Sequence, residues 1–421
     1  MPDSERPEAS VDASYYVAFG RRRQSDAEFL ATATGVINDL ETELHRLKAE
    51  ERGNWRALEI GCGSGRLMRP MSRHFLEIHG VDVSADFIRQ ARENLLDIPN
   101  ARPHQIRGTS LEDFTDLSFD FAYSFDLFPH IPSRELVLAF LREIHRVVRP
   151  GGLVRLQFNG SAGSQSFDQW TGAQLRSHDI FEFADAYDFQ VLALDGVSTQ
   201  SLWTTWRRQP AGWSAGLAAK ISALGDRLPV EIHKITNASS FEPVAPCRGR
   251  FAAISIRAGN LPPDAGLNHL RATIGSSFGT ITSVGAPDRD GQQRIRVDLP
   301  ELEATGLLPV QLFWLDRPLS EPATLRVIPP GPPIPRVVGA PRCIENRIVT
   351  LTLEEIAHPS DIQVQMGGQP VEDLEKICID PRPQRYQVHF RLPEQIGPGL
   401  HHIKLNIGRR DLPPLPVDVV V

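Results

Sequence analysis

The chain is 421 residues long, which exceeds the size of one ordinary hydrophobic core and indicates two or three domains. Its formal net charge is −7, so a chain-wide attraction to nucleic-acid phosphates is not expected. Apolar residues make up 41% of the chain, yet no apolar run approaches the roughly 20 residues that a membrane helix requires. The polar start MPDSERPEAS lacks the pattern of a secretory signal, and we therefore expect a cytoplasmic location without a membrane partner.

The first predicted helix lies within residues 26–50 and precedes the first predicted strand. Its apolar side chains recur at helical spacing, with charged residues on the other face: Phe29, Leu30, Val36, Ile37, Leu40, Leu44 and Leu47. Together with the polar start, this helix forms a predicted N-terminal helical region over residues 1–52.

From residue 55 onward, short apolar runs alternate with helical stretches, beginning with ALEIG (57–61) and continuing to GLVRLQF (152–158). A helical stretch near 171–187 and the runs VLALDG (191–196) and SLWTTWR (201–207) close this region. Alternation of this kind is typical of strand–helix–strand crossovers, in which helices cover both faces of a parallel sheet. We therefore predict an α/β domain with a mostly parallel sheet over residues 53–208.

The first predicted strand runs into a glycine-rich loop, ALEIGCGSGR (57–66). Glycines at positions 61, 63 and 65 let the backbone turn tightly and approach a ligand closely. A dinucleotide-binding loop would need a third glycine at position 66, where this chain has Arg66. The spacing therefore favours a ligand without a pyrophosphate and disfavours a nicotinamide cofactor.

Four segments in order make residues 55–158 resemble the class I S-adenosylmethionine-dependent methyltransferases of the small-molecule type. They are the glycine loop, HGVDVS (79–84), FDFAYSFDLFPHIP (119–132) and LREIHRVVRPGGLVRLQF (141–158). In that family an acidic residue precedes the first glycine by two positions, as Glu59 does, and another holds the ribose hydroxyls, as Asp82 would. The resemblance implies a Rossmann-like domain with a seven-stranded sheet, S-adenosylmethionine as cofactor and methyltransferase activity.

The resemblance also implies which residues surround the cofactor. Where the family usually has an Asp near the adenine, this chain has Thr109, Ser110 and Leu111. Tyr15 and Tyr16 lie in a region that often folds over the cofactor in related enzymes, although packing of an N-terminal arm explains them as well. The predicted cofactor-binding set is Glu59, Gly61, Cys62, Gly63, Gly65, Asp82, Val83, Thr109, Ser110, Leu111, Phe125, Asp126 and Tyr16.

His130 follows the fourth predicted strand, where family members often place residues that face the substrate. Its imidazole could accept a proton from a hydroxyl acceptor, or it could only shape the pocket, and the residues leave both interpretations open. Asp126 is a secondary candidate, either for ligand contact or for holding loop amides. Trp170, Trp203 and Trp206 could line an acceptor site, but packing is the preferred interpretation for them.

The cysteines carry no sign of metal or nucleophilic chemistry. They are widely scattered and form no zinc-ligand spacing, so no metal site is expected: Cys62, Cys247, Cys343 and Cys378. Cys62 lies inside the glycine loop, but no base is apparent beside it, and we assign it to packing.

The second half of the chain has a different character. Residues 209–229 are rich in alanine and bounded by prolines, which predicts a connecting helix. Beyond it, β-prone runs separated by Pro, Gly and Asn predict two all-β modules, residues 230–328 and 334–421, on either side of the proline-rich break at 329–335.

These two modules repeat each other in sequence. Three pairs of equivalent residues share a spacing of 93: Pro300 and Pro393, Gly306 and Gly399, and Val310 and Ile403. A unit of about 90 residues suits a small β-sandwich. The modules resemble the IPT/TIG and similar immunoglobulin-like families.

These patterns together predict methyl transfer from S-adenosylmethionine to a hydroxyl of a sugar, a glycan or another small molecule. QFNG (157–160) and WTG (170–172) resemble bacterial methyltransferases that modify glycans or secondary metabolites. The β modules are expected to recognise the acceptor or to form homo-oligomers. Two alternatives stay open: a non-catalytic scaffold whose modules bind a glycan or a protein, and a nicotinamide-dependent oxidoreductase.

Overall fold

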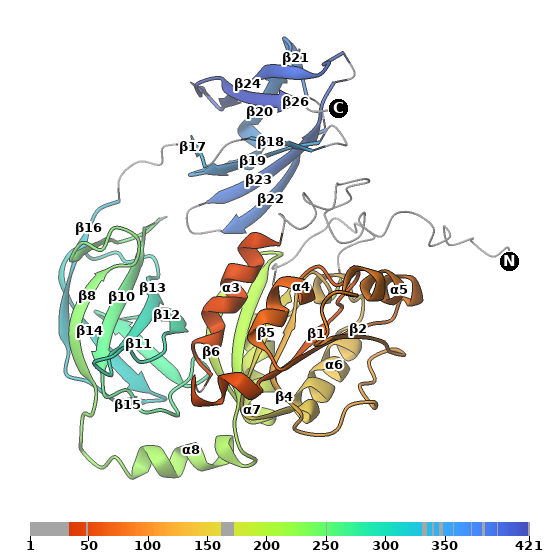
Figure 1. The fold of residues 1–421 in the computed structure, drawn as a ribbon. Coiled ribbons are helices and arrows are strands. Elements are labelled where there is room, and N and C mark those ends of the chain that lie inside the picture. Colours follow the sequence, from red (N-terminus) through yellow and green to blue (C-terminus); the bar gives the residue numbers. More distant parts are fainter. Residues whose placement is uncertain are drawn as a thin grey trace, which may run out of the picture.

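The computed structural model describes residues 33–419, with the exception of 48, 161–171, 250, 331–334, 339–340, 345–347, 357, 372, 381–383 and 394. Three parts follow one another along the chain: an α/β part up to residue 208, module 1 (residues 230–328) and module 2 (residues 336–419). Module 1 lies beside the α/β part, and module 2 lies at the top in Figure 1. Among the described helices, none is long and apolar enough to cross a membrane.

The α/β part is built on seven strands in the order β3-β2-β1-β4-β5-β7-β6. Neighbours from β3 to β5 are parallel, while β7 runs antiparallel to β5 and β6, so the sheet is mixed at one end. The strands are β1 (Arg56–Ile60), β2 (Glu77–Asp82), β3 (Ala101–Gln105), β4 (Phe119–Ser124), β5 (Val148–Phe158), β6 (Phe189–Asp195) and β7 (Leu202–Arg208). The predicted Rossmann-like α/β arrangement is confirmed.

Helices cover both faces of this sheet, as the continuous apolar runs of its strands require. One face carries α3 (Thr34–Leu44), α4 (Met68–Met71) and α5 (Ala85–Asn94), and the other carries α6 (Arg134–Val147) and α7 (Ser177–Ala186). Short 3₁₀ turns complete this part: η1 (Ala49–Asn54), η2 (Ser72–His74) and η3 (Phe128–His130). The N-termini of α5 and α6 are capped by Ser84 and Ser133, whose hydroxyls accept backbone N–H bonds.

The carboxyl ends of the parallel strands lie at the upper edge of the sheet in Figure 1, where the chain enters α5. Helix α8 (Trp213–Ser222) lies at the opposite end, after the antiparallel strand β7. This helix is shorter than the predicted connector over 209–229. Gly212, the N-cap of this helix, has a φ of 82°, and Gly225, two residues beyond the C-cap, has a φ of 57°, so a glycine in left-handed backbone lies on each side of the helix.

The described residues of module 1 form nine strands arranged in two layers. One layer has the order β8-β10-β13-β12, and the other joins β11, β14 and β16, with β12 taking part in both. The strands are β8 (Glu231–Asn237), β9 (Val244–Pro246), β10 (Ala253–Gly259), β11 (Leu270–Ile274), β12 (Ser277–Val284), β13 (Gln293–Asp298), β14 (Gly306–Trp314), β15 (Arg317–Pro318) and β16 (Ala323–Ile328).

Module 2 repeats this strand order. Its layers are β17-β19-β23-β22 and β20-β24-β26, packed around one buried apolar core. The elements are β17 (Arg336–Val337), β18 (Arg342–Ile344), β19 (Ile348–Glu354), η4 (Pro359–Asp361), β20 (Ile362–Met366), β21 (Gln369–Pro370), β22 (Glu375–Asp380), β23 (Arg385–Arg391), β24 (Gly399–Ile407), β25 (Arg410–Asp411) and β26 (Leu415–Val419). Val310 and Ile403, equivalent in sequence, are both fully buried.

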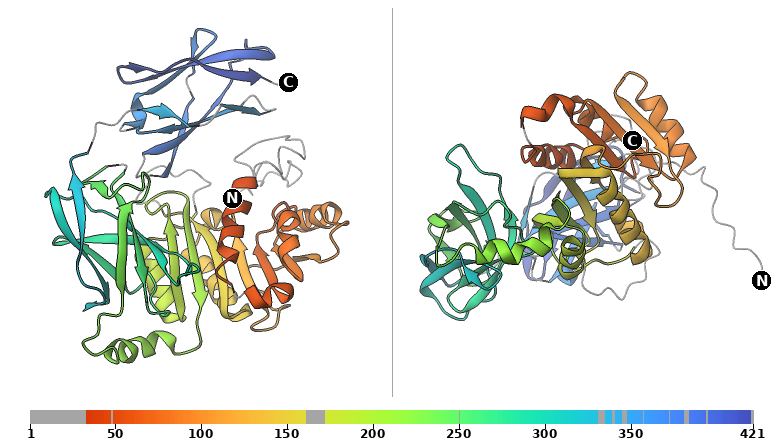
Figure 2. Two further views of the ribbon diagram at one scale, coloured as in Figure 1. Left: turned by 60° about the vertical axis from the view of Figure 1, so that its left-hand side comes forward. Right: turned by 90° about the horizontal axis from the view of Figure 1, so that it is seen from below.

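Module 1 is joined to the edge strand β6 of the α/β sheet. Ser283 of β12 pairs with Ala193 of β6, and the backbone N–H of Leu267 donates to the carbonyl of Val191 at 2.8 Å. The side chain of Asn268 accepts from the backbone N–H of Val191 and donates to the carbonyl of Phe189. One apolar core runs through both parts, and the two views of Figure 2 show them side by side.

Candidate functional site

The glycine loop follows β1 at the carboxyl edge of the sheet. Gly61 has a φ of 74°, and a Cβ atom placed on it would lie 2.9 Å from Cβ of Leu127. The backbone N–H groups of Gly61 and Cys62 both donate to the carbonyl of Val81, which ties the loop to β2. Position 61 therefore requires glycine, both for its backbone conformation and for the close approach of Leu127.

Asp82 lies at the end of β2, directly beside this loop. Its carboxylate accepts from the backbone N–H of Gly63 at 3.0 Å and of Ser84 at 2.9 Å. Burial raises the pKa of Asp82, although these N–H bonds act in the opposite direction. Val83 follows and is 57% exposed, which places an apolar side chain beside the carboxylate.

Glu59 is enclosed beneath the loop, with 3% of its surface exposed. The hydroxyl of Tyr123 donates to its Oε2 at 2.8 Å. Burial raises the pKa of Glu59 to about 8, with a further increase from the negative charge of Asp82, while Tyr123 and Arg66 oppose the shift. The Glu59 carboxyl is therefore largely protonated near neutral pH.

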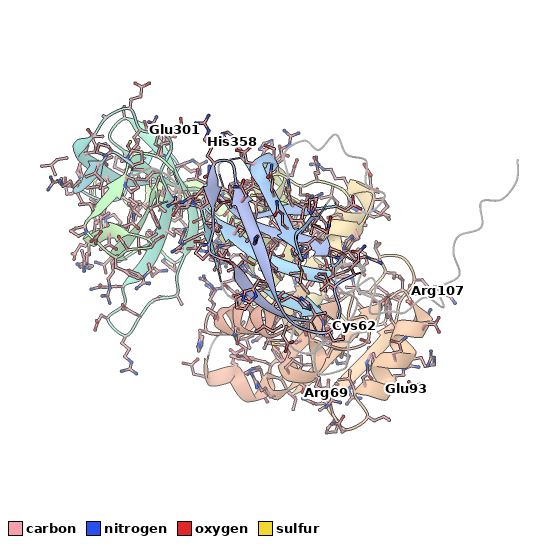
Figure 3. The ribbon with its side chains drawn as sticks, turned by 90° about the horizontal axis from the view of Figure 1, so that it is seen from above. Cys62, Arg69, Glu93, Arg107, Glu301 and His358 are labelled. Atoms are coloured by element: carbon pink, nitrogen blue, oxygen red, sulfur yellow. The ribbon has the colours of Figure 1, made fainter. Side chains whose placement is uncertain are left out.

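Cys62 lies under the same loop and is buried. Burial raises the pKa of its thiol well above the usual value, so it remains protonated. In Figure 3 Cys62 lies toward the interior, whereas Arg69, Glu93 and Arg107 lie along the periphery of the α/β part. This placement supports the assignment of Cys62 to packing.

The segment after β4 brings Asp126 and His130 together. Asp126 has a φ of 60°, a conformation that is uncommon for residues other than glycine, and its backbone N–H donates to Oε1 of Gln157 at 2.9 Å. Its carboxylate lies 3.2 Å from Nε2 of His130. The His130 side chain is 44% exposed, whereas that of Asp126 is 11% exposed. The structure thus places the accessible imidazole of His130 within hydrogen-bond distance of a carboxylate whose backbone is held by Gln157.

Two arginine side chains flank a stacked aromatic pair at this edge of the sheet. The Arg66 guanidinium lies 5.4 Å from the centre of the Phe125 ring, and that ring stacks on Trp203 with centroids 5.8 Å apart. Arg155 lies 5.0 Å from the centre of the Trp203 ring on β7. The sequence favoured packing for Trp203. Only the strand register, in which Gln157 of β5 pairs with Trp203 of β7, shows that it reaches this edge. Trp206 is buried in the core, and Trp170 lies outside the described residues.

The segment expected near an adenine divides into two environments. Thr109 and Ser110 are partly exposed, but Leu111 is fully buried in the apolar core. The backbone N–H of Leu111 donates to Oε2 of Glu143 at 2.9 Å. The side chain of Leu111 therefore packs in the core, and its assignment to the cofactor-binding set stays a prediction. Tyr15 and Tyr16 lie outside the described residues.

The groups that reach this edge of the sheet can bind a ligand and move a proton. They comprise the backbone of the glycine loop, the acidic side chains of Glu59 and Asp82, the Phe125–Trp203 stack and the Asp126–His130 pair. Among the residues that the structure describes, no group of three or more His, Cys, Asp and Glu side chains could hold a metal ion.

Comparisons with known proteins match the α/β part of the chain. Residues 57–152 match a family model described as "Methyltransferase domain". Similar curated proteins include phosphoethanolamine N-methyltransferase 2 of Caenorhabditis elegans, 30% identical over 27% of this chain and 26% of that protein. Another is the 2-methyl-6-phytyl-1,4-hydroquinone methyltransferase of Synechocystis sp., 28% identical over 37% of this chain and 55% of that protein.

A third relative is the ubiquinone biosynthesis O-methyltransferase of Mesorhizobium japonicum, 33% identical over 24% of this chain and 39% of that protein. The matches thus span between about a quarter and just over half of these relatives. The expected resemblance is confirmed for the α/β part, which contains a class I methyltransferase domain whose cofactor is S-adenosylmethionine.

Proposed function

We propose that the chain transfers the methyl group of S-adenosylmethionine to a hydroxyl of a sugar or another small molecule. The observation that carries this proposal is the position of the Asp126–His130 pair at the same sheet edge as the glycine loop and Asp82. A proton acceptor and a cofactor-binding loop at one edge suit methylation of a hydroxyl.

The residues at this edge fit the cofactor. The glycine loop lets backbone approach the ligand, the Asp82 carboxylate can accept hydrogen bonds from a ribose diol, and exposed Val83 offers an apolar contact. Thr109 and Ser110 stand nearest in sequence to the position that borders the adenine in the family. Once bound, S-adenosylmethionine supplies a methyl group already activated by its sulfonium charge.

The protein's own contribution would be to position the acceptor and receive its proton. His130 would accept the hydroxyl proton, and Asp126 would orient the imidazole and stabilise its protonated form. Phe125 and Trp203 would provide flat apolar faces for a sugar or an aromatic ring. The names of two relatives, a hydroquinone methyltransferase and an O-methyltransferase, support an oxygen-bearing acceptor.

For the second half of the chain, we propose two immunoglobulin-like sandwiches with different roles. Module 1 shares its core with the α/β part and would act as a structural extension of it. Module 2 lies above the carboxyl edge of the sheet in Figure 1, and we assign acceptor recognition to it. Its position on the side of the proposed site supports this assignment.

The cofactor part of the proposal is tested by calorimetric titration with S-adenosylmethionine. We expect binding by the wild-type chain and a large loss of affinity in Asp82→Asn. Asp86→Asn, an exposed carboxylate in the first turn of α5, is the matched control and should bind normally. Absence of binding by the wild-type chain would favour the scaffold alternative, and binding of NAD instead would favour an oxidoreductase.

The acceptor is identified by transfer of a labelled methyl group. The chain is incubated with labelled S-adenosylmethionine and extracts fractionated into glycans and small molecules, and mass spectrometry locates the label. Labelling of an oxygen atom in a sugar or a phenol supports the proposal. Labelling of nitrogen or carbon alone contradicts it.

A further inference from the structure

A polar crevice lies at the junction of the α/β part and module 1, away from the glycine loop. It has a volume of about 210 Å³ and is lined by the end of the α3 segment, by β6 and β7, and by two loops of module 1. Among the described residues, its charged or titratable lining side chains are Arg46, Arg207 and His45, and no described carboxylate lines it. The wall of the crevice is therefore net positive.

The Arg207 guanidinium has no carboxylate partner among the described residues. Its Nη2 donates to the backbone carbonyl of Arg46 at 2.9 Å, and its side chain lines the crevice. Burial and the neighbouring charge of Arg46 both lower the pKa of Arg207. A partly buried cation beside another cation is costly unless an anion joins them.

Arg46 is fixed in place by bonds on both sides of the junction. Its Nε donates to Oε2 of Glu43 at 2.7 Å, and its Nη1 donates to the carbonyl of Val284 in module 1 at 2.6 Å. Glu43 therefore compensates Arg46, and no described carboxylate compensates Arg207. The lining also includes polar Gln293 and the exposed residue Ala286.

We propose that this crevice binds a phosphate group, either free phosphate or the phosphate of a small metabolite, between Arg207 and Arg46. Guanidinium groups match phosphate oxygens with paired N–H donors, and the volume suits a compact anion. The bound anion would connect the α3 segment, β7 and module 1, and would thereby stabilise the junction. This site is independent of the proposed methyl transfer.

The test is calorimetric titration with inorganic phosphate and with ribose 5-phosphate at constant ionic strength. We expect saturable binding by the wild-type chain, with the affinity about tenfold weaker in Arg207→Gln. Arg409→Gln, an exposed arginine in module 2, should bind as the wild type does. Tighter binding of ribose 5-phosphate would identify a metabolite, and equal binding would identify free phosphate.

A second pair of variants keeps both arginines. Ala286→Glu places a carboxylate at the exposed rim of the crevice and should abolish phosphate binding, whereas Ala286→Gln should retain it. This pair of variants tests phosphate binding in the crevice even if Arg207→Gln fails to fold. Absence of wild-type binding, or equal binding by Ala286→Glu and Ala286→Gln, would overturn the proposal.

Discussion

Asp126 combines an unusual backbone conformation with a direct contact to the proposed base. A φ of 60° in a residue other than glycine persists only where surrounding bonds hold it, and Gln157 provides such a bond. Gln157 in turn donates from Nε2 to the hydroxyl of Ser201 at 2.8 Å. The position of the carboxylate is therefore set by β5 and the start of the β7 segment, not by its own loop alone.

We predict that His130→Ala lowers turnover by about 10²- to 10⁴-fold, the usual contribution of a general base. The affinity for S-adenosylmethionine should stay nearly unchanged, because the imidazole is 44% exposed and bonded to Asp126. Steady-state kinetics and cofactor titration together measure the two effects. If turnover is unchanged, His130 only shapes the pocket.

The raised pKa of Glu59 should make the folded state less stable as the pH rises. Its pKa rises from an ordinary 4.5 to about 8 on folding, so the folded state binds the proton more tightly than the unfolded state does. Its contribution to stability is fully present below pH 4.5 and is lost as the pH rises through about 8. Replacement by a neutral amide of similar shape removes this titration.

We therefore expect Glu59→Gln to flatten the fall in the free energy of unfolding between these two pH values. Urea unfolding of the wild type and the variant across this range measures the difference. Asp86→Asn, an exposed carboxylate, serves as control and should leave the profile unchanged. Parallel profiles for wild type and Glu59→Gln would show that Glu59 does not titrate there.

Among the secondary-structure elements, β19 of module 2 carries a buried carboxylate that pairs with two partly exposed arginines. Glu354 is 2% exposed and accepts from the guanidinium groups of both Arg336 and Arg385. These two arginines lower the pKa of Glu354, although burial acts against them. The stabilisation is therefore present above the ordinary carboxyl pKa of 4.5 and is lost as the pH falls below it.

We predict that Glu354→Gln destabilises module 2 by about 1–3 kcal/mol, because two arginines lose their shared carboxylate. The figure is modest because Arg336 and Arg385 are 55% and 38% exposed and can be solvated. Chemical denaturation monitored by hydrogen exchange in β19 and β23 measures it. Asp418→Asn, exposed in β26, should have almost no effect.

The elements of the α/β part could largely be predicted from the sequence. The glycine loop, Asp82 and the alternation of strands and helices are local signals, because each depends on residues close together in the chain. The Phe125–Trp203 stack could not be predicted, since it depends on the register between β5 and an antiparallel strand about 45 residues later. The family resemblance predicts Leu111 as a cofactor contact, and the structure shows its side chain packed in the apolar core.

At the level of the whole molecule, module 1 packs against the edge strand β6 and stabilises the α/β part. Its loop residue Asn268 satisfies backbone groups of β6 that would otherwise be unpaired, and Gln190 of β6 donates to the carbonyls of Pro263 and Ala265. Sequence patterns did not predict this, because an edge strand carries no signal for which distant segment covers it.

We predict that a chain ending at residue 229 is strongly destabilised, because each buried backbone group of β6 left without a partner costs about 1–3 kcal/mol. Deletion of residues 336–421 is the matched control and should leave the melting temperature of the α/β part nearly unchanged. Differential scanning calorimetry of both truncations measures the contrast. Equal stability of the two would mean that module 1 is an independent appendage.

The contact between β6 and module 1 also limits how copies of this protein can associate. An exposed strand edge invites pairing with another chain, and here that edge is covered from within the molecule. At the other edge of the α/β sheet, β3 contains Pro103, which has no N–H to offer an incoming strand. Growth of the sheet from molecule to molecule is therefore blocked at one side and hindered at the other, which protects the fold against strand-mediated aggregation.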